Sequence, residues 1–389
     1  MQAQALYDLS PLARMMFMGV VIALGPLAWI WLRNRSRPLA ARLAALTLLT
    51  LFLTFDLVLF GAFTRLTDSG LGCPDWPGCY GSASPVGAKE HIAAAQAALP
   101  SGPVTHSKAW IEMVHRYLAT GVGVLILTLA AATWMARRRG GQAATVLSPW
   151  WPAFTLVWVC LQGAFGALTV TMKLFPAIVT LHLLGGLVLL ALLCAQAVRY
   201  HQAHSGAEPA AIAPGLRALL LCVFALLWVQ VALGGWVSTN YAVLACTGFP
   251  SCQGSLWPAM NFAEGFELWR HLGQTGEGGH ISFAALTAIH YTHRLAAYAV
   301  FAAVLLLAWR LWRVAGLRTQ ARWLAGLAVW QFASGLGNVV LGWPLAAAVA
   351  HTGGAAAFVV VLTWAVFASR AAAGESHERA QGAHRLSAS

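Results

Sequence analysis

Nine apolar runs constrain the fold of this 389-residue chain more than any other feature. Each run has about 20 residues or more, the length that a helix needs to cross the hydrocarbon core of a bilayer. The runs cover residues 12–33, 43–64, 110–136, 152–172, 176–199, 216–238, 282–309, 322–342 and 346–369. Because a spanning segment has to satisfy its own backbone hydrogen bonds, the runs predict an all-α polytopic membrane protein with nine helices. The 59% hydrophobic and 9% charged residues exclude an ordinary soluble domain.

The net charge of +12 indicates membrane topology and does not indicate nucleic-acid binding. Of the 24 Lys and Arg residues, 16 fall on one side of the nine-helix arrangement. They are Arg33, Arg35, Arg37, Arg42, Arg137, Arg138, Arg139, Arg199, Arg217, Arg310, Arg313, Arg318, Arg322, Arg370, Arg379 and Arg385. Loops rich in Lys and Arg face the cytoplasm. We therefore expect a multi-pass protein of a bacterial-type inner membrane, with the N-terminus outside, the C-terminus in the cytoplasm, the lipid bilayer as a partner and no nucleic acid.

The first apolar run resembles a signal peptide in position but not in its flanks. One arginine, Arg14, lies at the start of the run, four lie at its end or after it, and no small-residue cleavage site is present. We expect residues 1–42 to form an anchor helix followed by a basic cytoplasmic loop, outside the repeated part of the chain. At the other end, residues 371–389 read as a polar cytoplasmic tail.

Two cysteine pairs lie in the long outer loops, residues 65–109 and 239–281. The pairs Cys73/Cys79 and Cys246/Cys252 share a spacing of six residues. An oxidising compartment outside the membrane permits two short-loop disulfides. We predict that the second disulfide is a structural staple, whereas the first is either a staple or a redox relay. The remaining cysteines are in apolar runs and are predicted to be small core residues: Cys160, Cys194 and Cys222.

The chain contains one long internal repeat. Residues 60–79 align without gaps against residues 233–252, which matches Gly61 with Gly234 and the cysteines of one loop with those of the other. The repeat continues where the pair at 115–116 matches the pair at 293–294, and residues 181–186 resemble residues 350–354. This pattern predicts two four-helix bundles in the same orientation, residues 43–200 and residues 201–370.

Four histidines occupy repeat-related positions. His115 and His182 belong to the first unit, and His293 and His351 belong to the second. All four lie early in helices that run inward, so we expect them at one depth near the outer leaflet. Two imidazoles from facing helices can supply both axial ligands of a haem iron. A single histidine in an apolar helix is more often a core residue, but chance placement would not follow the repeat, and the lack of clustered thiolates disfavours zinc.

Glu112 lies three residues before His115, so both share a face of a helix. Ionisable groups inside a membrane are costly and mark functional sites, although an ion pair with Arg116 or Arg65 is the alternative role for Glu112. At the corresponding position of the second unit stands His290.

The residues around these positions have predicted roles of their own. Either His290 or His293 could be the ligand, and the arginine that follows His293 favours His293. Arg116 and Arg294 are candidates to pair with haem propionates, with snorkelling toward the headgroups as the alternative. The glycines after His182 and His351 would leave room for a porphyrin face or would allow close helix contacts.

The chain resembles the haem A synthase family, of the cytochrome oxidase assembly protein 15 type, over about residues 45 to 370. The resemblance rests on the segment from Arg65 to Gly81, on the Glu112-x-x-His115-Arg116 signature and on the paired four-helix units. It implies oxidation of the ring-D methyl group of haem O to a formyl group, through successive hydroxylations, for cytochrome oxidase biogenesis. It also implies that Glu112 is the catalytic residue. The candidate partners that it implies are haem O synthase, cytochrome oxidase assembly factors and a second copy of the chain.

The same resemblance divides the work between the two units. It implies that His293 and His351 hold a resident haem b, and that His115 and His182 hold the substrate haem, haem O, which leaves as haem A. The electron acceptor stays open, as does whether one histidine leaves the iron during turnover.

Two other functions fit parts of the pattern. One is a dihaem b-type electron-transfer cytochrome with bis-His ligation, in which Glu112 would belong to a proton path. The other is a transporter built from a parallel repeat, with the histidines along a proton-coupled path. The polar groups cluster at one end of their helices, which disfavours the transporter.

Overall fold

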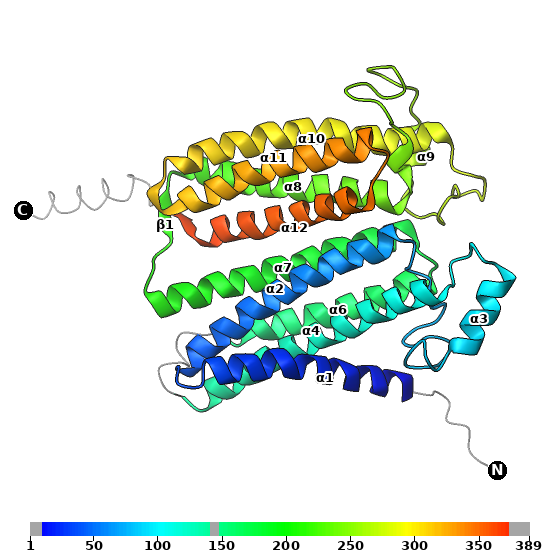
Figure 1. Cartoon of the computed structure of the whole chain (residues 1–389). Coiled ribbons are helices and arrows are strands. Elements are labelled where there is room, and N and C mark those ends of the chain that lie inside the picture. The colour runs from blue at the N-terminus through cyan, green and yellow to red at the C-terminus, as the bar shows by residue number, and fades with distance from the viewer. Residues whose placement is uncertain (1–9, 141–147, 373–389) are drawn as a thin grey trace, which may run out of the picture.

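The computed structural model describes residues 10–140 and 148–372, and in this part of the chain the fold is almost entirely helical (Figure 1). Nine helices of 22 residues or more dominate it. They are α1 (Ser10–Arg33), α2 (Leu39–Leu66), α4 (His106–Arg138), α6 (Trp150–Thr171), α7 (Pro176–Ser205), α8 (Pro214–Thr239), α10 (Phe283–Trp312), α11 (Arg318–Val340) and α12 (Leu345–Phe367). The predicted all-α polytopic class is therefore confirmed.

The predicted count of nine apolar spans is wrong by one. Eight of the long helices in the described ranges are apolar enough to cross a membrane by composition, and α11 is not among them. Its 23 residues are long enough to span, but they include Gln331 and Asn338, which are buried. Polar side chains that point into the bundle lower the hydropathy of a helix without exposing it to lipid.

The long helices lie side by side in one bundle (Figure 1). Helix α2 packs on α4 and α7, and α6 packs on α4 and α7. In the same way α10 packs on α8 and α11, and α11 packs on α12. Contacts of α12 with α2 and α7 join the two groups, whereas α1 lies against α4, where a side chain at Gly19 would collide with Thr120.

The main hydrophobic core occupies the half of the bundle away from the disulfide loops. Its fully buried members include Leu190 and Leu193 of α7, Leu220 of α8, Leu307 of α10 and Leu362 of α12. On the inward-running helices α7, α10 and α12 the histidine precedes these core residues, and on α4 His115 precedes the buried Leu125 and Leu129. The inner half therefore holds the bundle together by burial of apolar surface, and the outer half carries the polar chemistry.

The two ends of the bundle differ in their connections (Figure 1). One end carries the disulfide loops with the short helices α3 (Lys89–Ala98) and α9 (Phe262–Gly265) and the 3-10 turn η1 (Ala242–Leu244). The opposite end carries the basic connections, including a second 3-10 turn, η2 (Ala315–Leu317). Of the arginines assigned to this basic side, Arg379 and Arg385 lie outside the described residues.

A small parallel sheet at the basic end was not predicted. Strand β1 (Ala210–Ile212) pairs with β2 (Ser369–Ala371), and Arg217 donates to the carbonyl of Val366 at 2.7 Å and to the hydroxyl of Ser369 at 2.8 Å. These contacts fasten the end of α12 to the start of α8. Three-residue strands are too short to give an alternating pattern in the sequence.

Candidate functional site

The four histidines lie on four different helices near the disulfide-loop end of the bundle. His115 is on α4, His182 on α7, His293 on α10 and His351 on α12. His115 is close enough to His182 for an electrostatic interaction, and His293 is similarly close to His351. The structure thus brings together the two predicted pairs, one within each set of helices.

Each histidine faces a glycine on the long helix that precedes its own long helix in the chain. A Cβ atom at Gly61 or Gly335 would lie 3.1 Å from the Cε1 atom of His115 or His351, respectively. The corresponding distances are 3.4 Å from Gly166 to His182 and 2.9 Å from Gly234 to His293. Contacts below about 3.4 Å are tighter than ordinary van der Waals separations, so a larger residue would press on the imidazole.

This arrangement fits a bis-His haem in each set of helices. Glycine lets the imidazole lie against the backbone of the neighbouring helix, in apolar surroundings and away from the tightly packed inner core. Histidine from two facing helices is the ligand set that low-spin haem iron accepts. The donor set and the glycine cradle therefore suit two haems, one between α4 and α7 and one between α10 and α12.

The glycines that follow His182 and His351 have a different role. Gly185 lies against the side chain of Gln162, and Gly354 lies against Trp330 and Gln331. Both are therefore helix-packing positions on α7 and α12. Of the two roles predicted for them, the structure shows the close helix contact.

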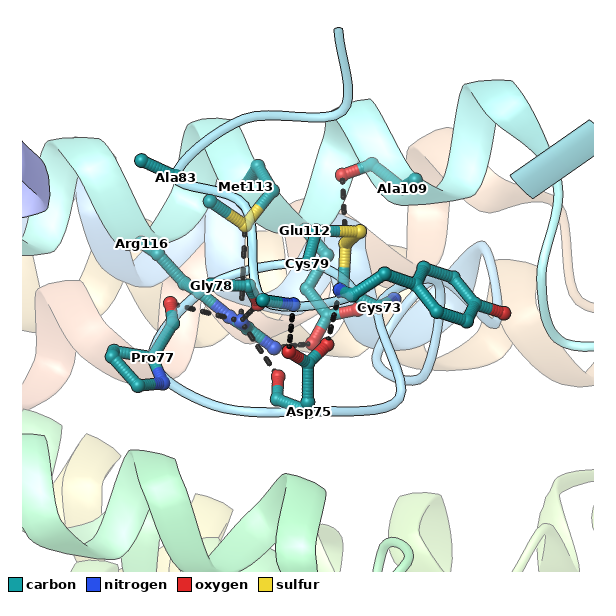
Figure 2. The surroundings of a disulfide bond; sticks show 12 residues. Cys73, Asp75, Pro77, Gly78, Cys79, Ala83, Ala109, Glu112, Met113 and Arg116 are labelled. Carbon is teal, nitrogen blue, oxygen red and sulfur yellow. Dashed lines mark hydrogen bonds and ion pairs between the residues drawn. A yellow bond between two sulfur atoms is a disulfide. The ribbon is translucent and has the colours of Figure 1, made fainter. Parts of the chain in front are cut away.

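Glu112 lies in a buried ion pair beneath the first disulfide loop (Figure 2). Its carboxylate accepts a hydrogen bond from the backbone N–H of Cys73 at 2.7 Å and pairs with the guanidinium of Arg116. The same guanidinium donates to the carbonyls of Asp75 at 3.0 Å, Pro77 at 3.2 Å and Gly78. Charged donors and acceptors in a dry site make strong hydrogen bonds, so this cluster locks the loop onto α4.

The second loop repeats this anchor with one change. Arg294 donates to the carbonyls of Gly248 at 2.9 Å and Ser251 at 3.1 Å, which are the repeat equivalents of Asp75 and Gly78. In place of the carboxylate, buried His290 lies with its Nδ1 atom 2.9 Å from the carbonyl of Ala242. The Nδ1 atom of His290 thus contacts the η1 turn, whereas His293 faces His351.

Both arginines therefore have backbone partners in the loops above them. Arg116 and Arg294 are buried and do not reach freely toward headgroups, which excludes snorkelling as their main role. Their predicted pairing with haem propionates stays a prediction.

Both predicted disulfides form, joining Cys73 to Cys79 and Cys246 to Cys252. The sulfurs are shielded, since Cys73, Cys79 and Cys252 are 0% exposed and Cys246 is 1% exposed. Of the other three cysteines, Cys194 is buried, as predicted. Cys160 and Cys222 are exposed on spanning helices, so the prediction that they are core residues is wrong. Lipid around these helices suits a small apolar thiol.

A polar junction links the two loops near the outer ends of α2 and α8. The guanidinium of Arg65 lies 4.0 Å above the ring of Tyr241 and donates to the carbonyl of Ser238. The Tyr241 hydroxyl donates to Asp68 at 2.6 Å. Arg65 therefore takes part in this junction, and Arg116 is the partner of Glu112.

Sequence reasoning missed the residues that face the histidines from neighbouring helices. Two of the facing glycines, Gly166 and Gly335, were not singled out. Nor were the glutamines that precede three of the facing glycines by four residues: Gln162, Gln230 and Gln331. A signal was present, since Gln-x-x-x-Gly occurs at 162–166, 230–234 and 331–335. That motif places both residues on one helical face, one turn apart.

Comparisons with known proteins identify the family. A family model described as COX15-CtaA, cytochrome oxidase assembly protein, matches residues 44–363. A protein named heme A synthase from Shewanella oneidensis is 38% identical over 314 residues, which cover 81% of this chain and 92% of that protein. A protein of the same name from Sinorhizobium medicae is 28% identical over 81% of this chain and 86% of its own length. Another, from Symbiobacterium thermophilum, is 28% identical over 72% of this chain and 79% of its own length. With its histidine pairs, anchored disulfide loops and a match along most of its length, the chain belongs to the COX15-CtaA family of cytochrome oxidase assembly proteins.

Proposed function

We propose that the chain is a haem A synthase, which oxidises the ring-D methyl group of haem O to a formyl group. Family membership and the names of the relatives support this function. The observation that carries it within the structure is the combination of two histidine pairs with a buried, ion-paired carboxylate, Glu112, three residues before His115, at a position where the second unit has His290. Two similar haem sites, of which one has a carboxylate on the helix face of its histidine, suit an enzyme that keeps one haem and modifies another.

The two units are assigned different haems on this proposal. Residues 43–200 take up haem O between His115 and His182, and residues 201–370 hold haem b between His293 and His351. When bound, haem b supplies one-electron transfer. The hydrogen-bonded arginine anchors keep each disulfide loop in place over the outer end of its unit.

Glu112 is the residue that we assign to the chemistry. Conversion of a methyl to a formyl group takes up one oxygen atom, as from water, and releases four electrons and four protons. A carboxylate three residues from His115 projects from the same face of α4, where it can accept a proton or stabilise positive charge on the oxidised carbon. The N–H of Cys73 and the guanidinium of Arg116 fix the orientation of that carboxylate.

Orientation and partners follow from the same assignment. The basic end of the bundle faces the cytoplasm and the disulfide loops face the outside of the inner membrane. Haem O would come from a membrane enzyme of haem O synthesis, and haem A would pass to assembly factors of cytochrome oxidase. Association with a second copy of the chain is part of the same proposal.

The first test measures conversion of haem O by variants of Glu112. Membranes that contain haem O and the wild-type chain are expected to accumulate haem A, measured by chromatography of extracted haems. Glu112→Gln should lower the rate about 100-fold, since general acid–base groups contribute about 10²–10⁴-fold. The matched control is Glu90→Gln on α3, which changes an exposed carboxylate and should leave the rate unchanged.

The outcomes separate the claims. Absence of haem A from wild-type membranes that retain both haem spectra would refute the synthase and favour a dihaem electron-transfer cytochrome. A wild-type rate in Glu112→Gln would leave the synthase in place and remove Glu112 from its chemistry.

A further inference from the structure

The two histidine pairs differ in the partners of their Nδ1 atoms. The side-chain amide nitrogen of Gln230 lies 3.1 Å from Nδ1 of His293, and the hydroxyl of Ser334 lies 3.0 Å from Nδ1 of His351. In the other pair, the Nδ1 atoms of His115 and His182 are buried and have no hydrogen-bond partner among the described residues. The backbone of Gln162 lies beside His182, but no hydrogen bond of normal geometry joins them.

The first part of this difference is a substitution between the equivalent helices α2 and α8. Gln230 precedes Gly234 by four residues, and Gly234 faces His293. The repeat equivalent of Gln230 is Leu57, four residues before Gly61. Leucine has no polar atom, so the first unit lacks a side chain that could bind Nδ1 at this place.

The second part is a substitution between the equivalent helices α6 and α11. Ser334 directly precedes Gly335, which faces His351. At the equivalent place, before Gly166, stands Phe165. Both side chains that bind Nδ1 in the second unit are therefore replaced by apolar side chains in the first.

Hydrogen bonds to the second ring nitrogen govern how firmly a histidine holds a metal. A histidine bound to iron through Nε2 carries a proton on Nδ1, and an acceptor for it fixes the ring and strengthens the ligand. The Ser334 hydroxyl donates to the carbonyl of Trp330 at 2.8 Å, so its lone pairs are free to accept that proton. Gln230 offers its amide oxygen to Nδ1 after a half-turn of the end group. This rotation gives up the hydrogen bond that the amide nitrogen donates to the His293 carbonyl at 3.1 Å, and it uses an oxygen that has no partner among the described residues.

We propose that Gln230 and Ser334 are positioning residues that make the His293/His351 pair a tight haem site. Leu57 and Phe165 correspondingly leave the His115/His182 pair as a site from which haem exchanges. The inference rests on the proposed function, because a substrate haem has to enter and leave while a resident haem has to stay. It adds the physical cause of that difference.

The test measures haem release from the purified full-length protein to excess apomyoglobin. Two kinetic phases are expected for the wild type, and His182→Ala and His351→Ala assign them, because each removes one phase. Gln230→Leu combined with Ser334→Ala should accelerate the slow phase about 10–100-fold, the range for loss of a partner behind a metal ligand. Ser334→Thr keeps the hydroxyl and should keep the slow phase.

A reciprocal variant guards against misfolding of the double variant. Leu57→Gln supplies an amide to His115 and should slow the fast phase without changing the slow one. An unchanged slow phase in the double variant, or an unchanged fast phase in Leu57→Gln, would overturn the inference. Haem release can be measured without any conversion of haem O. If the release rates change as predicted but no haem A forms, only the proposed function is refuted. If haem A forms but the variants release haem at the wild-type rates, only the inference is refuted.

Discussion

The glycines that face the histidines set how closely two helices approach at each proposed haem. Their spacings to the imidazoles differ, from 2.9 Å for a Cβ at Gly234 to 3.4 Å for one at Gly166. Since added atoms in a packed site force neighbouring side chains to move, the tightest position should tolerate a methyl group least.

We predict a graded loss of haem when these glycines are replaced by alanine. Gly234→Ala should lose the most haem, Gly61→Ala and Gly335→Ala should lose less, and Gly166→Ala should be close to wild type. Overpacking typically costs about 1–3 kcal/mol, which suffices to displace a ligand. Absorbance of the purified variants measures haem per polypeptide. Gly163→Ala is the control, because nothing lies within 4 Å of a Cβ there, and equal losses at Gly163 and Gly234 would contradict the prediction.

Single residues could be predicted where the repeat marks them. The histidines and the disulfide cysteines stand at matching positions in two copies of one pattern, and the structure pairs the cysteines as predicted. The repeat also matches Gly61 with Gly234, but it could not show that these glycines face the histidines, and it did not mark Gln230. Their roles depend on how α2 and α8 are rotated about their axes, and a sequence of uniformly apolar helices does not reveal that rotation.

At the level of the elements, the two disulfide loops share an anchor but differ in what they hold. The N–H of Cys73 donates to Glu112 of α4, whereas His290 of α10 faces the carbonyl of Ala242 rather than a cysteine. The first disulfide therefore shapes the hydrogen bonding of a carboxylate, and the second has no such link. The complete burial of Cys73 and Cys79 favours a staple over a redox relay, since a relay has to meet its partners.

Removal of the two disulfides should accordingly have different effects. Replacing either pair by alanine should destabilise the protein by about 2 kcal/mol, the chain-entropy value for so short a loop, measured as a lower melting temperature. Only Cys73→Ala with Cys79→Ala should also lower the rate of haem A formation. Cys246→Ala with Cys252→Ala is the matched control. Restoration of the first variant's rate by an added chemical oxidant would instead support the relay.

Elements were predictable to the extent that they are long and apolar. Every long helix of the described chain was expected near its observed position, because about 20 apolar residues leave few alternatives. Helix α11 shows the limit, since its inward polar residues lower its hydropathy. The short parallel strands β1 and β2 arise from segments far apart in the chain, whose pairing only the assembled bundle brings about.

At the level of the whole molecule, one architecture used twice supports two different tasks. Repeat-equivalent residues meet at the junction of the loops, where Arg65 contacts Ser238 and Asp68 contacts Tyr241. Helix α12 of the second group packs against α2 and α7 of the first. The two proposed haem sites therefore belong to one continuous helix bundle, which suits electron transfer between them.

The haem content of the purified wild-type protein distinguishes a haem A synthase from a cytochrome that keeps both haems. Extracted haems should be separated by chromatography and quantified per polypeptide, together with a low-spin bis-His absorption spectrum. We predict haem b at about one equivalent, retained through purification, accompanied by haem O or haem A in smaller and variable amount. Haem b alone at two equivalents, or no haem bound through the four histidines, would contradict a molecule built to keep one haem and convert another.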